Sequence, residues 1–459
     1  MDRWNRRLAA VLLICFSTGL ARLAAQEFPP PDGEDEKKPL SDVVPIEDRD
    51  LRTLLGSPPE RDERAGGGGG GTCFLQQCNQ NIYCFPGTNS ACLLQTFQET
   101  QWRICIYATY NKGIAIGPVD LKRTPTSPWR RILYKASPAE IFTSYHSGSP
   151  HFYDTQYGNG INWRQTVNAA DVGPFGIPIY LSQDFFFGPT IVAECKDRGV
   201  AWMCKGGSSS YVRRGQELLL WGVFDAGNYD YILEYGFRDD GAITFNTGAT
   251  GYNSPPQPDV AHNHDVLWRI DMDLNGAAGD TARYTRHIEP IGFNNLEALD
   301  LEDPFTNGYE GSEVWNDEEF NGLLVEDAAT NASLNPMGYE LHPERPGSSR
   351  HYGLGLGCTE NWSLADFWVS RWHPVEDNGW AVPWLCPDSY LFPYVGNNEK
   401  TINRDLVLWY LASAHHDPID EDKDPGLNWG VTLMHRFGFH LEPHNYFDHN
   451  PLGGLAVCP

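Results

Sequence analysis

The sequence predicts an all-β protein, built as a large antiparallel β-sandwich. From Thr72 onward, aromatic and β-branched runs of moderate length follow one another, and clusters of Gly, Asn, Asp and Pro separate them. The sequence contains no internal repeat, no long stretch of helical periodicity and no glycine-rich phosphate loop after a strand. A chain of 459 residues has room for two or three average domains, but single all-β domains often exceed about 200 residues. One large domain is therefore expected.

The first 25 residues have the pattern of a signal peptide. Arginines come first, an apolar stretch runs from about Leu8 to Leu20, and small residues near Ala21 and Ala25 offer a cleavage site. The apolar stretch is shorter than the roughly 20 residues that a spanning helix needs, and no later segment of the sequence approaches that length. The protein is therefore predicted to be secreted and extracellular, with no membrane anchor.

Residues 26–72 are rich in Pro, Asp, Glu and Arg and end in the glycine run 66–71, which predicts a disordered linker. Residues 73–459 form the predicted large domain, which opens with a Cys-rich segment (73–105). Ten of the 11 cysteines follow the signal peptide, and this even number predicts disulfides in an oxidising compartment. Cys195 and Cys204 are spaced to close a small loop, and sequons at Asn331 and Asn361 fit a secreted glycoprotein.

The strands of the large domain are predicted from eight runs of aromatic and β-branched residues. The acidic, turn-rich segment 295–346 is expected to form long loops or excursions from the sheets. In chain order, the predicted strands cover residues 102–110, 131–136, 217–224, 229–237, 242–248, 266–274, 405–413 and 430–441.

The formal net charge of −26 limits the classes of partner. Phosphate recognition needs clustered Lys and Arg, so we do not expect the protein to bind nucleic acid. The charge favours cationic ligands. A solvated acidic surface with no particular partner is the simpler alternative.

Two histidines in the stretch HNHD indicate a metal site. His262 and His264 are two residues apart at the start of a predicted strand, so their imidazoles point to the same face. A third nitrogen can come from His415 or His416, at the end of another predicted strand. Three imidazoles with room for water suit Cu(II) or Zn(II), and these residues alone leave both metals open.

A second cluster is acidic. Asp271 and Asp273 alternate along one predicted strand, and Asp405 begins another. Carboxylates and backbone carbonyls from two neighbouring strands make an oxygen-only site for a hard cation such as Ca²⁺. Carboxylates on a solvated strand face are the alternative interpretation.

Several motifs, taken together and in order, resemble those of the copper amine oxidases. The stretches GNYDYILEYGFRDDGAI, HNHDVLWRIDMDLNG, PMGYELHP, DLVLWY and HHDPIDED carry the resemblance, with WRICIY and ILYKASPAEIFTSY resembling the start of the family's catalytic domain. The resemblance covers about Trp102 to Gly454, so residues 73–459 correspond to that domain, without the family's usual N-terminal small domains. It implies an oxidase that converts a primary amine, O₂ and water to an aldehyde, ammonia and hydrogen peroxide.

The resemblance also assigns the cofactors. Tyr229 matches the tyrosine that copper and O₂ convert in place to topaquinone, which supplies the two-electron sink that amine oxidation requires. Its neighbour Asn228 would limit the orientation of the ring. The copper ligands match His262, His264 and His416, because the family pattern His-x-Pro-x-x-Glu-Asp begins at His416 and not at His415.

The remaining site residues follow from the same resemblance. The catalytic base corresponds to Asp154, the aromatic substrate gate to Phe152, and the tyrosine that hydrogen-bonds the quinone to Tyr145. The calcium positions correspond to Asp271, Asp273 and Asp405, with backbone carbonyls from Met272 and Leu406. Family members imply a homodimer.

The sequence departs from the family pattern at Asp225 and Asp417, and both changes are expected to place a new carboxylate near the active centre. Two other functions are compatible with parts of the sequence. One is a secreted copper- and calcium-binding protein of the same fold that has lost its activity. The other is a carbohydrate-active β protein, suggested by 15 tryptophans and many acids, which would need paired carboxylates facing one cleft.

Overall fold

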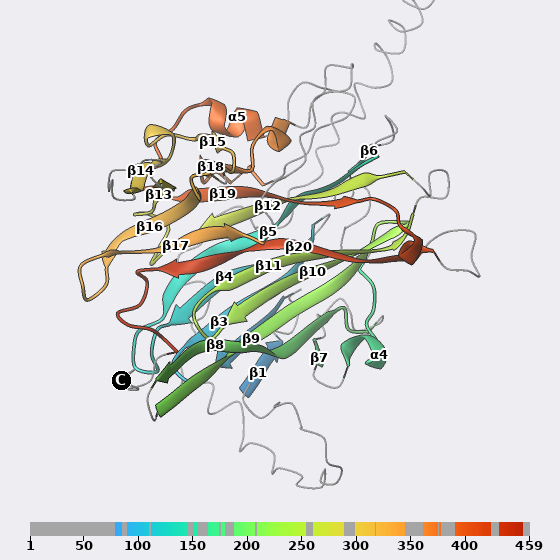
Figure 1. Cartoon of the computed structure of the whole chain (residues 1–459), viewed down its shortest axis with the longest axis horizontal. Coiled ribbons are helices and arrows are strands. Elements are labelled where there is room, and N and C mark those ends of the chain that lie inside the picture. Colours follow the sequence, from blue (N-terminus) through green and yellow to red (C-terminus); the bar gives the residue numbers. More distant parts are fainter. Residues whose placement is uncertain are drawn as a thin grey trace, which may run out of the picture. The chain divides into compact units, whose positions relative to one another are not determined.

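Two ten-stranded antiparallel sheets form the domain, as a computed structural model shows (Figure 1). The model describes residues 79–84, 90–109, 112–145, 151–153, 164–173, 176–179, 188–206, 209–253, 260–288, 299–316, 318–344, 361–374, 376–377, 391–423 and 431–452. The predicted signal peptide and linker lie outside these residues. Helices are short, and the longest that the described ranges contain is α5 (Leu391–Gly396). The predicted all-β antiparallel sandwich is confirmed.

The first sheet, called sheet A here, carries the predicted metal ligands. Its strand order is β1-β2-β3-β4-β5-β12-β19-β18-β15, and β6 pairs with β5. The strands are β1 (Asn79–Cys84), β2 (Ser90–Thr96), β3 (Gln101–Thr109), β4 (Gly113–Lys122), β5 (Arg130–Tyr145), β6 (His151–Tyr153), β12 (His262–Met272), β15 (Gly311–Glu313), β18 (Phe367–Arg371) and β19 (Leu406–His416).

The second sheet, sheet B, carries Tyr229. Its strand order is β14-β13-β16-β17-β20-β11-β10-β9-β8-β7. The strands are β7 (Gly176–Ile179), β8 (Ile191–Gly206), β9 (Ser209–Asp225), β10 (Tyr229–Arg238), β11 (Ile243–Tyr252), β13 (Thr281–Ile288), β14 (Leu299–Pro304), β16 (Gly322–Thr330), β17 (Pro336–Pro343) and β20 (Val431–His444).

The core between the sheets follows from strand alternation. Along β10, every second side chain from Tyr231 to Phe237 points inward and is fully buried. Facing it, Trp268 of β12 makes edge contacts with Tyr235 of β10 and Phe245 of β11, with ring centroids 5.7 and 5.6 Å away. These aromatic contacts across the sandwich fix β10 opposite β12, which sets Tyr229 opposite the histidines.

The segment 295–346 differs from its prediction. Its sequence predicts long loops or excursions from the sheets, but β16 and β17 are full members of sheet B, and β14 and β15 also fall within this segment. Their charged side chains have partners that make strand positions tolerable: Glu326 of β16 pairs with Arg283 of β13. Acidic composition alone therefore misled the prediction here.

Four of the described cysteines are disulfide-bonded, as the even number of cysteines predicted. Cys92 and Cys105 stand directly opposite each other on β2 and β3 and form a disulfide. Cys195 and Cys204 are also disulfide-bonded, but both stand on the one extended strand β8, so they do not close the small loop that their spacing suggested. Cys73 and Cys78 lie outside the described residues.

Candidate active site

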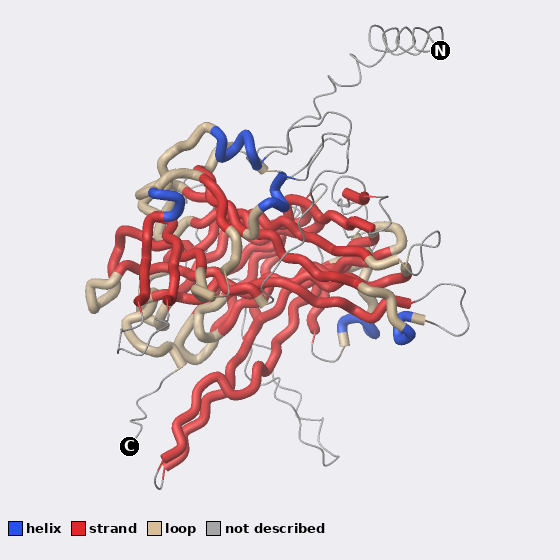
Figure 2. The backbone as a smooth tube through the Cα atoms, turned by 45° about the horizontal axis from the view of Figure 1, so that its top comes forward, coloured by secondary structure: helices blue, strands red, loops and turns tan. Residues whose placement is uncertain are grey.

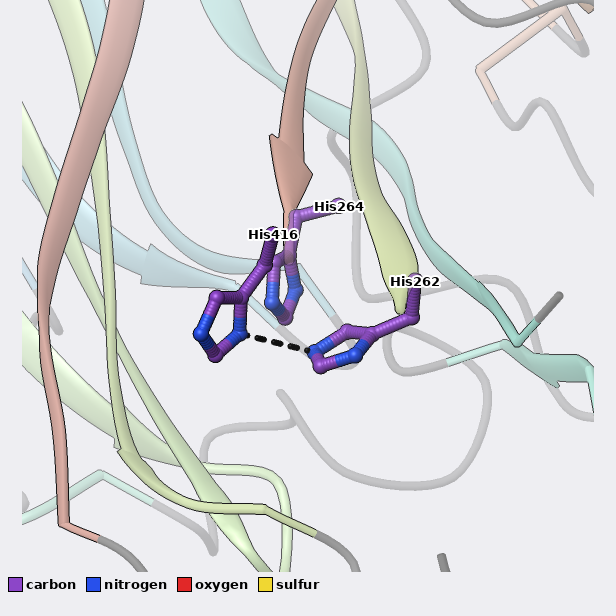
Figure 3. Close-up of side chains that lie close together, drawn as sticks. All are labelled: His262, His264 and His416. Atoms are coloured by element: carbon purple, nitrogen blue, oxygen red, sulfur yellow. Dashed lines mark hydrogen bonds between the residues drawn. The ribbon is translucent and has the colours of Figure 1, made fainter. Parts of the chain in front are cut away.

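Three histidines meet between the sheets, at one end of the β12–β19 pair. His262 stands directly opposite His416 in the antiparallel register, and His264 follows two residues along β12 on the same face. All three are fully buried. Their rings are close: the centroid of His262 lies 4.9 Å from that of His264 and 4.7 Å from that of His416 (Figure 3). The structure therefore brings together the three ligands that the sequence predicted.

One nitrogen of each ring is anchored by the surrounding protein. His262 Nδ1 donates to the carbonyl of Val260 at 3.0 Å, and His416 Nε2 donates to the carboxylate of Asp422 at 2.9 Å. His264 Nδ1 lies 3.0 Å from the hydroxyl of Tyr231, on the facing sheet. These contacts fix each imidazole in one orientation, as ring-anchoring partners do around protein-bound metals.

The other nitrogens are directed toward one another. One ligand atom from each histidine lies within 4.8 Å of the others, and His416 Nδ1 is 3.2 Å from His262 Nε2. His264 Nε2 is buried and has no hydrogen-bond partner among the described residues. Burial, followed by the neighbouring His262 and His416, lowers the pKa of His264, so its ring is neutral. Three clustered imidazoles, one of which has a buried nitrogen without a hydrogen-bond partner among the described residues, fit a copper ion.

Tyr229 reaches this centre from sheet B. Its hydroxyl lies 2.9 Å from His262 Nε2 and 3.0 Å from His416 Nδ1, and it donates to Asn253 Oδ1 at 3.0 Å. Burial raises the pKa of the phenol, so the hydroxyl is protonated in the metal-free protein. Tyr229 therefore stands where its ring oxygen contacts the same space as the three histidines.

The turn before Tyr229 depends on a close backbone approach. Gly251 of β11 stands opposite Tyr229 with a φ of 129°. A Cβ added there would lie 2.4 Å from the carbonyl oxygen of Asn228. Only glycine permits this approach. The amide of Asn228 donates to the carbonyl of Tyr252 at 2.9 Å, which ties the turn to β11.

Tyr145 packs against one of the three histidines. It ends β5, directly opposite His262, and its ring stacks on the His262 ring with centroids 4.5 Å apart and planes at 21°. Phe152 belongs to β6 and pairs with Thr143 of β5, but its side chain is not among those described. Asp154 lies outside the described residues. The roles of Asp154 and Phe152 therefore stay predictions.

Two partners of the site were missed from the sequence. Tyr231 follows Tyr229 by two residues, so strand alternation could have placed it on the same face. Asp422 is the last residue of the motif that identified His416, and its carboxylate also accepts from the backbone amides of Ile419 and Leu433. Although burial opposes ionisation, the hydrogen bond from His416 and these amides lower the pKa of Asp422.

Neither of the two unusual carboxylates, Asp225 and Asp417, is buried. Asp417 is exposed. Asp225 accepts a hydrogen bond from the amide of Gly227 at 2.7 Å and stands opposite Asp230 on β10. Asp225 and Asp230 line a groove of about 630 Å³. Because Asp230 and Tyr229 are adjacent in a strand, their side chains point to opposite faces of sheet B.

The predicted calcium residues also come together. Ligand atoms of Asp271, Asp273 and Asp405 all lie within 4.8 Å of one another, at the end of the β12–β19 pair away from the histidines. Met272 and Leu406 stand opposite each other in the same register. Burial, followed by the charges of Asp273 and other nearby aspartates, raises the pKa of a further carboxyl, Asp280, well above its ordinary value.

Comparisons with known proteins agree with this site. The chain is 26% identical to a histamine oxidase from Arthrobacter globiformis over 362 residues, which cover 70% of this chain and 52% of that protein. It is 21% identical to a primary amine oxidase from Lens culinaris, over 76% of this chain and 59% of that protein. The chain thus spans a little over half the length of these relatives.

Solved structures share the fold. A copper-containing benzylamine oxidase from Hansenula polymorpha superposes with a TM-score of 0.62 at 17% identity, covering 78% of this chain and 60% of that one. A Pichia pastoris lysyl oxidase gives a TM-score of 0.60 at 19% identity, covering 78% of this chain and 52% of that one. The family model for the enzyme domain of copper amine oxidases matches residues 196–456, more than half of the sequence. The chain belongs to the copper amine oxidase family.

Proposed function

We propose that this protein is a primary-amine oxidase, which converts an amine, O₂ and water to an aldehyde, ammonia and hydrogen peroxide. One observation carries the proposal. The hydroxyl of Tyr229 lies within 3.0 Å of nitrogens from two of three clustered histidines, although the tyrosine and the histidines come from different sheets. Membership of the copper amine oxidase family supports the same activity.

Each residue of the site has a proposed task. His262, His264 and His416 hold Cu(II). Copper and a topaquinone made from Tyr229 supply the two-electron sink that no genetically encoded side chain provides. Tyr145, stacked on His262, bounds the space around the Tyr229 ring and presents its hydroxyl to the quinone. Asn228 limits the ring's orientation, because its amide fixes the turn from which Tyr229 emerges.

Proton transfer from the substrate is assigned to Asp154, and control of substrate entry to Phe152. Asp154 follows the short strand β6, which pairs with the end of β5 where Tyr145 lies. A carboxylate in this position would remove the proton from the α-carbon of the bound amine. The amine itself is not assigned beyond the class of primary amines.

Three further properties accompany this function. Asp271, Asp273 and Asp405, with carbonyls of Met272 and Leu406, hold Ca²⁺ as a structural ion. A homodimer is part of the proposal, and the exposed apolar side chains of the β8–β9 ribbon support it. It is secreted after removal of residues 1–25, with 26–72 as a linker to the catalytic domain at 73–459. Its disulfides support an oxidising compartment.

Glycosylation is proposed only at Asn361, whose side chain is not described. Asn331 is 8% exposed, and its amide nitrogen donates to the carbonyl of Asn445 at 3.1 Å. A glycan on this nitrogen would break that contact. Among the described residues, no helix is both long and apolar enough to cross a membrane.

The proposal is tested by the visible spectrum of the copper-loaded protein before and after phenylhydrazine. We expect a quinone band that shifts with the hydrazine in the wild type and in the control Tyr211→Phe, an exposed tyrosine. Tyr229→Phe should bind copper but show no band. A wild-type protein that binds copper yet stays colourless would instead support the inactive member of the fold.

A further inference from the structure

The connection between β12 and β13 crosses from sheet A to sheet B beside the acidic cluster. Asp273 directly follows β12 in sheet A, and Asp280 directly precedes β13 in sheet B. The amide of Arg404 donates to the carbonyl of Asp280 at 2.8 Å, within an isolated β-bridge between the two residues. Because Arg404 is the neighbour of Asp405, this bridge brings Asp280 next to the cluster.

The carboxyl group of Asp280 is buried and half satisfied. The side chain is fully buried, and its Oδ2 accepts from the amide of Leu274 at 3.3 Å. Its Oδ1 has no hydrogen-bond partner among the described residues. A carboxylate oxygen in a protein interior needs a donor or a cation, since burial without either is strongly unfavourable. The neighbourhood of Asp280 is rich in carboxylates, which makes a cation the fitting partner.

Sheet B holds this connection in place through Asp327 of β16. Its Oδ1 accepts from the side-chain amide of Asn275 at 3.0 Å and from the amide of Ala329 at 2.7 Å. Gly279, with a φ of 126°, packs so closely that an added Cβ would lie 3.0 Å from Asp327 Oδ2. The residue before Asp280 is therefore fixed, and the Asp280 carboxyl has little freedom to turn toward solvent.

We propose that Asp280 is a direct ligand of the divalent cation held by Asp271, Asp273 and Asp405, so that the ion joins sheet B to sheet A. The inference rests on the proposed calcium site and adds a ligand from the other sheet. Ca²⁺ takes six to eight oxygen ligands, so a fourth carboxylate fits its coordination. The ion then fixes the far end of β12, the strand whose near end carries His262 and His264.

Calcium binding to the full chain tests the assignment. EDTA-treated wild type, Asp280→Asn and the control Asp300→Asn are titrated with Ca²⁺ by isothermal calorimetry. Asp300 is also in sheet B, but its side chain is 85% exposed. We expect the dissociation constant for Ca²⁺ to rise at least tenfold in Asp280→Asn and to stay within twofold of wild type in Asp300→Asn. Equal affinity in all three proteins, or no binding by wild type, overturns the proposal.

Melting temperatures give a second readout, because the difference between Asp280→Asn and wild type should have opposite signs in EDTA and in Ca²⁺. In EDTA, Asp280→Asn should melt at or above the wild-type temperature, because the amide oxygen can still accept from the amide of Leu274 and adds no carboxyl group to the acidic cluster. In Ca²⁺ it should melt below wild type, because it loses a ligand. A variant that melts below wild type by the same amount in both conditions would show a hydrogen-bonding role and overturn the proposal.

Two additions keep the test decisive. If Asp280→Asn does not fold, Asp280→Ala replaces it; if neither folds, equal melting of wild type in Ca²⁺ and in EDTA overturns the assignment. The phenylhydrazine spectrum is recorded on the same samples. A quinone band without calcium binding leaves the oxidase proposal standing, and calcium binding without a band leaves the ion assignment standing.

Discussion

The carboxylate of Asp422 fixes the orientation of the His416 ring. The strand β19 places His416 inward and His415 outward, and His415 is exposed with its Nδ1 2.8 Å from Asn263 Oδ1. The His416 ring is buried, and its Nε2 donates a hydrogen bond to the carboxylate of Asp422. Its Nδ1 lone pair is then left facing His262 and Tyr229. The family motif at His416 thus contains both a proposed copper ligand and the group that orients it.

Replacement of Asp422 by Asn should weaken copper binding. The amide cannot stabilise the His416 ring as a carboxylate does, and losses of this kind typically reduce metal affinity about 10- to 100-fold. The control is Asp420→Asn, an exposed residue two positions away whose side chain contacts Lys423. Copper affinity is measured by competition with a chelator. Equal losses in both variants would contradict the orienting role of Asp422.

Strand alternation and motif spacing predict the residues of the metal centre, but not every partner. His262 and His264 follow from alternation alone, while the choice of His416 over His415 needed the family motif. Asp280 was missed because its sequence context is a glycine-rich turn that suggests exposure. Its burial arises from the bridge to Arg404, a residue more than 120 positions away that local sequence does not reveal.

At the scale of elements, the same limit explains the error in segment 295–346. The eight predicted strands each fall on a strand of the structure, because their apolar residues alternate or cluster as buried strands do. In β16 and β17 the acidic residues are neutralised by partners on neighbouring strands, such as Arg283 for Glu326. The sequence shows the acidic residues of these strands but not the residues that will pair with them, so the acidic composition predicted loops.

The β17–β20 pair carries histidines and glutamates on its half-buried outer face. His342 Nε2 lies 3.5 Å and His444 Nδ1 3.8 Å from Glu340 Oε2, and His440 and Glu442 extend the row on β20. Although burial opposes it, the nearby His342 and His444 imidazoles hold the pKa of Glu340 well below its ordinary 4.5. The Glu340 carboxylate in turn raises the pKa of both histidines above 6.5.

These shifts predict a pH-dependent contribution to stability. The histidines stabilise the fold fully below pH 6.5, and this contribution is lost as the pH rises through their raised pKa. Glu340 contributes above pH 4.5 and loses its part as the pH falls through its lowered pKa. Both contributions are therefore complete between pH 4.5 and 6.5. Because the histidines are partly exposed, their pairs are worth about 0.5–1 kcal/mol.

The substitution His342→Gln should lower the melting temperature by about 1–2 °C at pH 6 and leave it unchanged at pH 9. The reason is that the histidine is charged at pH 6 and largely neutral at pH 9. Thermal unfolding at both pH values measures the effect, with the exposed His449→Gln as control. A loss of the same size at pH 9 would indicate packing and not charge.

At the scale of the whole molecule, the outer part of the β8–β9 pair has apolar side chains that the rest of the domain leaves exposed. Figure 2 shows it as a ribbon of two strands that projects from the body of the domain. Its apolar side chains are open to solvent: Val200 is 53% exposed, Met203 51% and Val212 49%. Two strands alone are marginally stable in water, and exposed apolar surface of this kind is typical of an interface. A second copy of the chain is the proposed cover.

Substitutions that remove this apolar surface should therefore separate the dimer. Met203 and Val212 stand opposite each other, so Met203→Lys with Val212→Glu creates a favourable cross-strand pair and preserves the ribbon. Burying these polar groups at an interface should cost about 3 kcal/mol or more, roughly a hundredfold in the dimer dissociation constant. Phe320→Lys with Leu334→Glu is the matched control, because these residues are 74% and 80% exposed outside the ribbon. Light scattering coupled to size-exclusion chromatography should give the dimer mass for wild type and control and the monomer mass for the ribbon variant. A ribbon variant that stays dimeric would mean that another surface joins the subunits.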